Sequence, residues 1–461
     1  MMPKSMEAGK RIFGEKVFER IVSYLKQDPE NNISRAVELV VKAPVAAHHK
    51  DYARGIKEQI ENNPVIQQYI KRILNELDDN VINHLFVNFL VNASLVGLPK
   101  QQQAAARLGC NVPYTILIDP TSKCNLQCEG CWAGAYEKHD SLSLEEVDRI
   151  VAEARDLGMY FIAMSGGEPL LWPHLEELCR RHRDVAFMIY TNGTLINEGT
   201  ARWMRDVGNI TPAISIEGSR ETTDQRRGEG VYDRIMKAMD NLKANGVAFG
   251  FSLTATNENC EEIFSDRFID LMIEKGAIYG WSFHYIPIGS NPDFSRMLSP
   301  QQRAVMAKRV REIRSKKPVM VADFWNDGEL TGGCIAGGRR YFHINARGDV
   351  EPCAFVHFAA DNIKGKKLEE VLKNPFFRAY REHRPFSENL LRPCPLIDQP
   401  ENMRAMVQEA GVSPTHIGAD SILHGSHARQ IDRIAAAWET AADRLRVELQ
   451  NESAGTELEK V

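Results

Sequence analysis

The stretch Cys124-Asn-Leu-Gln-Cys128-Glu-Gly-Cys131 places three thiols within eight residues, directly after the apolar run Tyr114–Asp119. Thiolates are the usual protein ligands of iron–sulfur clusters, because they are soft and are easily deprotonated by the metal. A C-x3-C-x2-C loop can hold three irons of a four-iron cube, which leaves one iron free to bind a small molecule and pass it an electron. A structural zinc site is the alternative, but zinc sites need four ligands in paired short spacings, and His139 is the nearest further donor.

The composition is that of an ordinary folded protein. The 461 residues include 26% charged and 43% hydrophobic side chains, and the formal net charge is -5, so we expect no nucleic acid partner. Met1–Lys26 is mixed and charged, without the apolar core of a secretory signal. Polar residues interrupt the longest apolar stretch, Val81–Leu98, so no transmembrane segment is predicted. Nine cysteines without a secretory context indicate metal ligands and buried thiols in a reducing cytoplasm.

The first part of the chain predicts an all-helical region. Apolar residues recur at helical spacing from Ile12 to Leu25 and again from Ile60 to Ile73. Asn63-Pro64 lies within the second of these stretches and is expected to interrupt the helical pattern there. The apolar run Val81–Leu98 predicts a further helix. We interpret it either as a helix buried against the next domain or as a hydrophobic surface for an apolar substrate or a membrane interface.

Between Tyr114 and Gly289, short β-rich runs alternate with amphipathic helices, which is typical of parallel strands joined by right-handed crossovers. The six predicted strands are Tyr114–Asp119, Met159–Met164, Val185–Tyr190, Pro212–Ile216, Ala248–Leu253 and Gly280–Tyr285. The predicted helices are Ser143–Leu157, Pro173–His182, Glu198–Val207, Val231–Asn245 and Glu261–Glu274. The predicted fold class is therefore α/β, with a partial (β/α)6 TIM-type barrel. Chemistry in such barrels gathers at the carboxyl ends of the strands.

Polar motifs follow the predicted strands at those ends. After the second strand comes Ser165-Gly166-Gly167-Glu168-Pro169, in which two glycines let the backbone approach a ligand closely and the glutamate suits an ammonium group. Ser215 and Glu217 end the fourth strand, and Arg226-Arg227 precedes the next helix. Because a guanidinium can bind a carboxylate through two parallel hydrogen bonds, this arginine pair is a candidate anion-binding group.

The cysteine loop and the glycine–glutamate motif, one strand apart, resemble the radical S-adenosylmethionine (SAM) superfamily. The resemblance implies that Cys124, Cys128 and Cys131 bind a [4Fe–4S] cluster whose open iron chelates SAM. It further implies that the glycine–glutamate motif holds the methionine amino group of SAM, and that nearby residues contact its ribose and carboxylate. The cofactor-binding residues implied in this way are Gly166, Gly167, Glu168, Ser215, Glu217 and Arg227.

Alternative roles stay open for some of these residues. Ser215 and Glu217 can instead satisfy backbone groups of the barrel, and Arg227 can be an ordinary solvated arginine. One position departs from the family pattern, in which an aromatic or bulky residue usually precedes the last cysteine. Here that position is Gly130, and Trp132 follows the cysteine instead. We expect Trp132 to shield the cluster or the adenine.

A second set of cysteines lies far along the chain. Arg340–Asn345 and Asp349–Cys353 predict a β-hairpin with glycine in the turn, which brings Cys334 and Cys353 together. The pattern resembles the SPASM and twitch extensions of radical SAM enzymes. It implies that Cys334, Cys353 and Cys394 bind an auxiliary [4Fe–4S] cluster, with a non-cysteine residue or an open iron at the fourth position. Three unrelated buried thiols are the alternative.

Four regions follow from these patterns. Residues 1–110 are expected to form the N-terminal helical domain, and residues 111–290 the radical SAM partial barrel. Residues 291–400 are expected to hold a linker helix and the small cluster-binding extension; the basic helix Gln301–Arg314 is interpreted as a solvated outer face. Residues 401–461 are expected to form C-terminal helices and, from Asn451, a disordered tail.

The resemblance implies an enzyme that reductively cleaves SAM to a 5′-deoxyadenosyl radical, which abstracts hydrogen from a substrate carbon. Relatives with such an extension often modify peptides or proteins, so a peptide substrate is expected, with radical modification of a lipid or other hydrophobic small molecule as the alternative. A non-catalytic iron–sulfur or zinc-binding protein is the alternative of another class. The mechanism also implies a reducing partner such as flavodoxin or ferredoxin.

Overall fold

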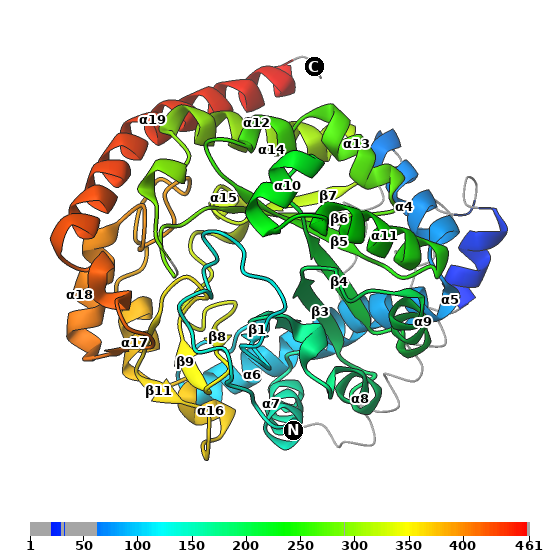
Figure 1. The fold of residues 1–461 in the computed structure, drawn as a ribbon, viewed down its shortest axis with the longest axis horizontal. Coiled ribbons are helices and arrows are strands. Elements are labelled where there is room, and N and C mark those ends of the chain that lie inside the picture. The colour runs from blue at the N-terminus through cyan, green and yellow to red at the C-terminus, as the bar shows by residue number, and fades with distance from the viewer. Residues whose placement is uncertain (1–19, 29–31, 33–61, 290, 459–461) are drawn as a thin grey trace.

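A computed structural model describes residues 20–28, 32, 62–289 and 291–458 (Figure 1). The strands of its central sheet are β1 (Thr115–Ile118), β2 (Phe161–Met164), β3 (Ala186–Thr191), β4 (Ile210–Ser215), β5 (Gly250–Ala255), β6 (Tyr279–His284), β7 (Met320–Asp323), β8 (His343–Ile344), β9 (Asp349–Glu351) and β11 (Asp361–Asn362). Their spatial order is β11-β9-β8-β1-β2-β3-β4-β5-β6-β7. A separate two-stranded sheet pairs β10 (Phe358–Ala359) with β12 (Ser413–Pro414).

Strands β1 to β7 are parallel neighbours in chain order, which confirms the predicted fold class of a partial barrel. All six predicted strands are present, and each end lies within two residues of its predicted position. The seventh strand, Met320–Asp323, was not predicted, because four residues at a sheet edge are too few to show a period. The extension joins the same sheet, since β8 pairs in parallel with β1. The sheet therefore continues beyond the predicted boundary at residue 290.

Helices cover the outer face of this curved sheet in Figure 1. Those between the barrel strands are α7 (Leu144–Asp156), α8 (Leu175–Arg181), α9 (Glu198–Val207), α10 (Arg220–Arg227), α11 (Val231–Ala244), α12 (Cys260–Ile263) and α13 (Asp266–Glu274). A capping box starts α7: Ser143 accepts from the Glu146 amide at 3.2 Å, and the Glu146 carboxylate accepts in return at 2.9 Å. The single helix predicted over Glu261–Glu274 is two helices, because Ser265 caps the start of α13.

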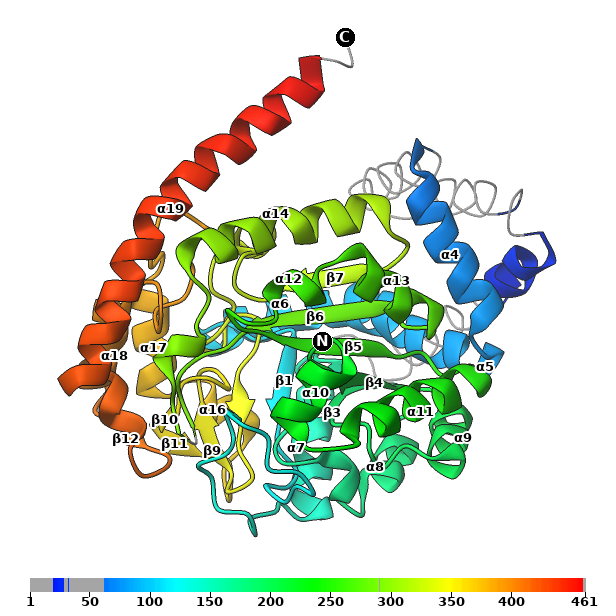
Figure 2. The same cartoon turned by 45° about the horizontal axis from the view of Figure 1, so that its top comes forward.

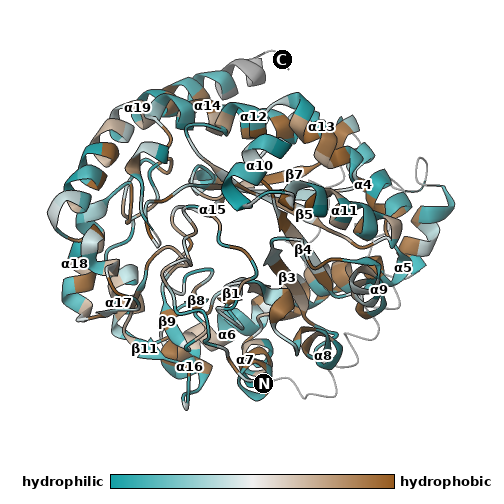
Figure 3. Ribbon diagram, in the orientation of Figure 1, coloured by the Kyte–Doolittle hydropathy of each residue, from teal (hydrophilic) through white to brown (hydrophobic). Residues whose placement is uncertain are grey.

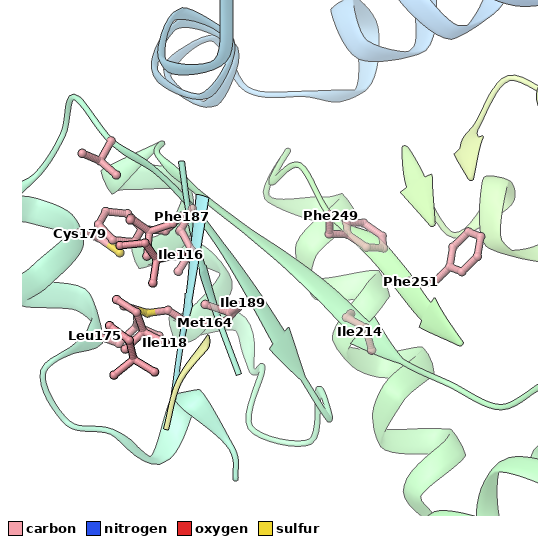
Figure 4. Packing of buried hydrophobic residues seen from close by; sticks show 14 of the residues in the cluster. Ile116, Ile118, Met164, Leu175, Cys179, Phe187, Ile189, Ile214, Phe249 and Phe251 are labelled. Atoms are coloured by element: carbon pink, nitrogen blue, oxygen red, sulfur yellow. The ribbon is translucent and has the colours of Figure 1, made fainter. Parts of the chain in front are cut away.

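The main core lies between the strands and this helical layer. Figure 4 shows Leu175 and Cys179 of α8 beside Ile116, Ile118 and Phe187 of the strands, and all five are buried. Hydrophobic residues therefore concentrate on the strands and on the helix faces turned toward them, as Figure 3 shows. Cys179 belongs to this core and is fully buried.

The N-terminal helices run beneath the barrel, at the amino-terminal ends of the strands. They are α4 (Pro64–Glu76), α5 (Asp79–Val81), the π-helices η1 (Ile82–Phe86) and η2 (Asn88–Gly97), and α6 (Leu98–Leu108). Their side chains reach the loops that precede β2 and β7: Gln101 donates to Gly158 O at 2.8 Å, and Arg72 to Pro318 O at 2.8 Å. The predicted helices before residue 62 lie mostly outside the described residues, which include the helical segment 20–27.

The apolar helix at Val81–Leu98 packs against the barrel. Asn88 and Asn92 donate to the carbonyls of Arg183 and Asp184 at 3.0 and 3.1 Å, and the Phe89 ring lies 4.9 Å from that of Phe161 on β2. Among the described residues, the helical stretch Asp79–Leu108 is the one that is long and apolar enough for a membrane span by length and composition, and 47% of its apolar window is buried inside the protein. These contacts favour the interpretation as a buried helix.

The helices of the C-terminal part are α14 (Pro300–Lys316), α15 (Gly328–Thr331), α16 (Leu368–Val371), α17 (Pro375–Glu382), α18 (Pro400–Ala410) and α19 (Gly425–Leu458). The chain also has three 3-10 turns in its described residues: η3 (Pro169–Leu171) in the barrel, η4 (Phe294–Arg296) before α14 and η5 (Ala419–Ile422) before α19.

The structure corrects two predictions for the C-terminal part. Helix α14 is not a wholly solvated face, since Met306, Val310 and Ile313 are buried. The tail is not disordered from Asn451, because α19 continues to Leu458 and projects beyond the body of the protein in Figure 2.

Candidate active site with two cysteine pockets

The three-cysteine loop follows β1 at the carboxyl end of the sheet. Cys124, Cys128 and Cys131 are each partly exposed, and all three line one cavity of ≈ 620 Å³. Burial raises the pKa of Cys124 and Cys128, and the Arg227 guanidinium opposes that effect at Cys128. Three thiols facing one cavity, with a cation beside them, fit the anionic thiolate set that an iron–sulfur cluster requires.

An aromatic ring from another segment packs against Gly130, the position at which this chain lacks the bulky residue of the family pattern. Gly130 adopts a left-handed backbone with φ of 64°, and a Cβ built on it would lie 2.6 Å from the Tyr285 ring. Tyr285 follows β6 and lines the same cavity, as does Trp132. The loop thus packs against an aromatic side chain supplied by a distant segment, and only glycine leaves room for it.

The glycine–glutamate motif lies directly against the start of the cysteine loop. A Cβ on Gly167 would lie 2.1 Å from Lys123 O, and one on Gly166 would lie 2.4 Å from Thr121 O. Hydrogen bonds from the Gly167 and Glu168 amides to these same carbonyls join the two loops, at 2.9 and 2.8 Å. Both glycines also line the cavity, so they place the two loops side by side there.

Glu168 is fully buried and its carboxylate is held by the chain itself. Oε1 accepts hydrogen bonds from the Thr191 hydroxyl at 2.7 Å and the Leu170 amide at 3.1 Å, and Oε2 accepts from the Asn192 amide at 2.8 Å. Burial raises its pKa, while these donors act in the opposite direction. The carboxylate ties the end of β2 to the end of β3, and a carboxylate can accept about four hydrogen bonds, so one position remains for a further donor.

Two residues predicted separately to contact SAM pair with one another in the structure. Glu217, fully buried, accepts from Nε of Arg227 at 2.9 Å and also pairs with Arg226. Burial alone lowers the pKa of Arg227, but Glu217 and Cys128 outweigh it, so the net pKa is raised. The Arg227 guanidinium lies 4.0 Å from Cys128 Sγ, and Ser215 lines the cavity at the end of β4.

The rest of the cavity wall is largely aromatic. The rings that line it are Tyr114, Trp132, Phe161, Tyr190, Trp281, Phe283, Tyr285, Phe324, Tyr341 and Phe355. Trp281 and Phe283 are stacked on β6 with an interplanar angle of 11°. The cavity extends from the cysteine loop to Tyr114 and Phe161, at the amino-terminal ends of β1 and β2, and therefore runs through the inside of the barrel.

The second set of cysteines converges on its own cavity of ≈ 160 Å³. Cys334 follows α15, Cys353 follows β9 and Cys394 lies between α17 and α18, and all three line this cavity. Burial raises the pKa of Cys353 to about 12 and that of Cys394 well above its ordinary value. The Tyr341 hydroxyl donates to Cys353 Sγ at 2.7 Å. The predicted hairpin is present as β8 and β9 and brings Cys334 and Cys353 to one site.

The two cavities share walls. Trp281, Phe324, Thr331, Ile335 and Phe355 line both of them. The Trp132 ring, next to Cys131, lies 6.1 Å from the Phe355 ring, which is two residues from Cys353. Three thiols gathered beside the larger cavity fit an auxiliary cluster. Burial raises the pKa of Cys334, and the cationic Arg384 opposes that effect.

A buried ionic network that the sequence analysis missed joins the two regions. His343 on β8 is fully buried; its Nδ1 lies 2.6 Å from Glu351 Oε2, and its Nε2 lies 2.9 Å from Asp119 Oδ2, close as an ion pair although not directed as a hydrogen bond. Burial alone lowers the pKa of His343, but the two carboxylates raise it to about 10. The position of Asp119, at a strand end beside the cysteine loop, was the available signal.

Comparisons with known proteins agree with this geometry. Residues 118–265 match the family model described as the radical SAM superfamily, and residues 334–395 match SPASM, an iron–sulfur cluster-binding domain. An AdoMet-dependent heme synthase of Methanosarcina barkeri is 27% identical over 302 residues, which are 59% of this chain and 86% of the relative. The mycofactocin maturase MftC of Mycobacterium ulcerans is 29% identical over 294 residues, 59% of this chain and 78% of the relative.

Solved structures share the fold. Streptococcus suis SuiB bound to S-adenosylmethionine aligns with a TM-score of 0.54 and 19% identity, over 78% of this chain and 87% of that one. The chain belongs to the radical SAM superfamily and is an enzyme of that class. Its cofactors are a [4Fe–4S] cluster with SAM, and its SPASM domain indicates an auxiliary iron–sulfur cluster.

Proposed function

We propose that this enzyme abstracts a hydrogen atom from an elongated apolar small molecule that carries an anionic group. The observation that carries the proposal is the cavity through the barrel, with the cysteine loop at one end and aromatic rings along its length. In this proposal Cys124, Cys128 and Cys131 hold the SAM cluster, while Cys334, Cys353 and Cys394 hold the auxiliary cluster. A peptide, the substrate expected from the extension, is the second candidate, because MftC and the heme synthase are similar to the chain to nearly the same degree.

Arg340 supplies the anion-binding end. It lines the cavity and is exposed, and its backbone carbonyl accepts from the Tyr114 amide at 2.8 Å, at the start of β1. Within the described part of the chain, its guanidinium makes no hydrogen bond or ion pair. A guanidinium binds a carboxylate through two parallel hydrogen bonds, so an anionic head at Arg340 would direct an apolar body along the barrel toward the cysteines.

The chain's own residues position the reactants and protect the radical. A reduced cluster held by Cys124, Cys128 and Cys131 would supply the electron for the reductive cleavage of SAM, and with it the hydrogen-abstracting chemistry. Glu217 holds Arg227 beside Cys128, and Gly166 and Gly167 allow the motif loop to lie against the cysteine loop. The aromatic walls exclude water and leave few competing hydrogen donors near the reactive carbon.

The electron requires an external donor. We propose flavodoxin or ferredoxin in the cytoplasm, where thiols stay reduced, because the partly exposed cysteine loop lies at the open carboxyl end of the barrel.

The domain boundaries at 110, 290 and 400 are part of this proposal. The N-terminal helices would close the lower end of the barrel, and the remaining C-terminal region would enclose the auxiliary site.

The test begins with anaerobic reconstitution, counting of iron and sulfide, and measurement of 5′-deoxyadenosine after addition of dithionite and SAM. Three probes are then compared: palmitate as a linear carboxylate, iron-coproporphyrin as a flat one, and a short apolar peptide. We expect one carboxylate probe to increase deoxyadenosine formation. A response to the peptide alone would support the second candidate, and zinc in place of iron would overturn the mechanism.

A matched pair of arginine variants tests the binding end. Arg340→Gln should raise the apparent KM for the carboxylate probe at least about tenfold while leaving deoxyadenosine formation without substrate unchanged. Arg429→Gln, an exposed arginine on α19, is the control and should behave as wild type. Equal KM values in both variants would exclude Arg340 as the anion-binding group.

A further inference from the structure

The pocket of Cys334, Cys353 and Cys394 lacks a fourth cysteine. A cubane cluster has four irons and is commonly held by four thiolates, so one iron here needs another ligand or stays open. The remaining cysteines outside the two sites, Cys110, Cys179 and Cys260, belong to the hydrophobic core between strands and helices, and none of them lines this pocket. The fourth ligand must therefore come from another residue type or from outside the protein.

Tyr380 on α17 brings an unpaired hydroxyl to this pocket. It is fully buried, it lines the pocket with the three cysteines, and its hydroxyl has no hydrogen-bond partner in the described structure. Leaving a buried hydroxyl unpaired is costly, and nearly all such groups in native proteins are paired. The hydroxyl of Tyr380 thus points to a bonding partner that the polypeptide does not supply.

The ring of Tyr380 is held rigidly. A Cβ on Gly337, three residues after Cys334, would lie 2.5 Å from Tyr380 Cγ, so the ring packs directly on the cysteine-bearing loop. The rings of Phe376 and Phe386 contact it nearly edge-on, with centroids 5.4 and 5.6 Å away. A ligand whose orientation is locked by packing loses little entropy on binding a metal.

The other oxygen donors near the pocket already have partners. Asp398, a fully buried carboxylate, pairs with Arg303 at 2.5 Å and accepts from the Cys394 amide at 3.1 Å. The Tyr341 hydroxyl donates to Cys353 Sγ at 2.7 Å. Of the side-chain oxygens that line the pocket in the described residues, Asp323 accepts from Asn326, Asp327 pairs with Arg314, and the Thr331 hydroxyl donates to Gly333 O. The Tyr380 hydroxyl is the one among them without a partner.

We propose that the phenolate oxygen of Tyr380 is the fourth ligand of the auxiliary cluster. The proposal rests on the assignment of that cluster to Cys334, Cys353 and Cys394. The phenol proton passes to solvent as the iron–oxygen bond forms, and no electron moves in that step. A cluster with four protein ligands has no open iron, so it would exchange electrons with the substrate radical and would not bind the substrate directly.

The experiment isolates the auxiliary site. The Cys124→Ala/Cys128→Ala/Cys131→Ala variant removes the ligands of the other site, and after anaerobic reconstitution about four irons per chain should remain. Tyr380→Phe is added to this background, and Tyr341→Phe, which removes a neighbouring hydroxyl, is the matched control. Each protein is treated with isotope-labelled cyanide, and its binding to the reduced cluster is followed by electron nuclear double resonance. Iron-57 Mössbauer spectra of the same samples, and of the wild-type chain, report the coordination of each iron.

We expect cyanide to bind only the Tyr380→Phe protein, which should also show one distinct iron site. Cyanide binding to the triple-alanine variant that retains Tyr380 would overturn the ligand assignment while leaving the auxiliary cluster in place. Identical spectra of that variant and its Tyr380→Phe derivative would do the same. A shifted reduction potential of the auxiliary cluster in Tyr380→Phe, without cyanide binding, would mean that Tyr380 donates a hydrogen bond to the cluster. That result also overturns the ligand assignment. An iron-free background together with only about four irons in the wild-type chain would instead overturn the auxiliary site itself.

Discussion

The two cysteine pockets are built in opposite ways. Cys124, Cys128 and Cys131 lie on one short loop and line a cavity of ≈ 620 Å³ that runs through the barrel. Cys334, Cys353 and Cys394 come from three separate segments and meet in a cavity of ≈ 160 Å³. Three cysteines on one short loop can be recognised from their spacing, because the loop alone brings them together. The second pocket forms only when the whole extension has folded, and the cysteine spacing does not predict the tyrosines and arginines around it.

Removing one cysteine from each pocket should separate the two sites most strongly. Cys128→Ala should reduce deoxyadenosine formation to the level of the protein-free control and lower the iron content from about eight to about four per chain. Cys353→Ala should lose a similar amount of iron yet still cleave SAM. Cys110→Ala, a buried thiol outside both pockets, should retain all of the iron. Loss of SAM cleavage in Cys353→Ala would show that the pockets do not act separately.

The ionic link between the pockets should dominate stability. His343→Gln leaves Asp119 and Glu351 buried without their cation, which should lower the free energy of unfolding by about 3–5 kcal/mol. Chemical denaturation of the cluster-free protein measures it. His139→Gln, at an exposed histidine with 76% of its side chain accessible, should change little. An unchanged unfolding free energy in His343→Gln would contradict the link.

The same link predicts a pH dependence. The charged imidazolium of His343 has a pKa raised from 6.5 to about 10, because Asp119 and Glu351 outweigh the effect of burial. Its contribution to stability is therefore complete below pH 6.5 and is lost as the pH rises toward 10. The wild-type advantage over His343→Gln should shrink steadily over that interval, as measured by denaturation at several pH values. An advantage that grows with pH would show that His343 is neutral in the folded state.

Contact between the two loops of the first pocket can be tested at a glycine. Gly167→Ala forces a Cβ to within 2.1 Å of Lys123 O, so the loops must separate. We expect a loss of about 1–3 kcal/mol in stability and at least about a tenfold rise in the Kd for SAM, measured by equilibrium dialysis. Gly199→Ala, within α9, adds a Cβ whose one close neighbour is the Asn197 side chain at 3.2 Å, and it should leave SAM binding unchanged.

The smallest expected effect concerns the hydrogen bond to Cys353. Tyr341→Phe removes a donor to the thiolate, and a hydrogen bond of about 1 kcal/mol corresponds to roughly 20–60 mV for a one-electron couple. The reduction potential of the auxiliary cluster should become more negative by that amount in a redox titration followed by electron paramagnetic resonance. A potential that moves upward would mean that the tyrosine does not donate to this sulfur.

Much of the barrel was predictable because its signals are local. Alternating short strands and amphipathic helices identified six strands to within a residue or two, and helix α9 was predicted with both of its ends correct. Strand β7 was missed because four edge residues show no period, and the parallel pairing of β8 with β1 joins segments more than two hundred residues apart. No local pattern encodes such a pairing.

From the sequence one could predict a cluster-binding first pocket and the likeness of the second to a known extension, because both predictions follow from the spacing of cysteines and glycines. The way in which these sites are completed depends on the folded chain. Folding places Tyr285 against Gly130, pairs Glu217 with Arg227, and sets Tyr380 beside three distant cysteines. Spacing along a chain reports ligands that share a loop, whereas burial and partners depend on segments that meet only when the chain has folded.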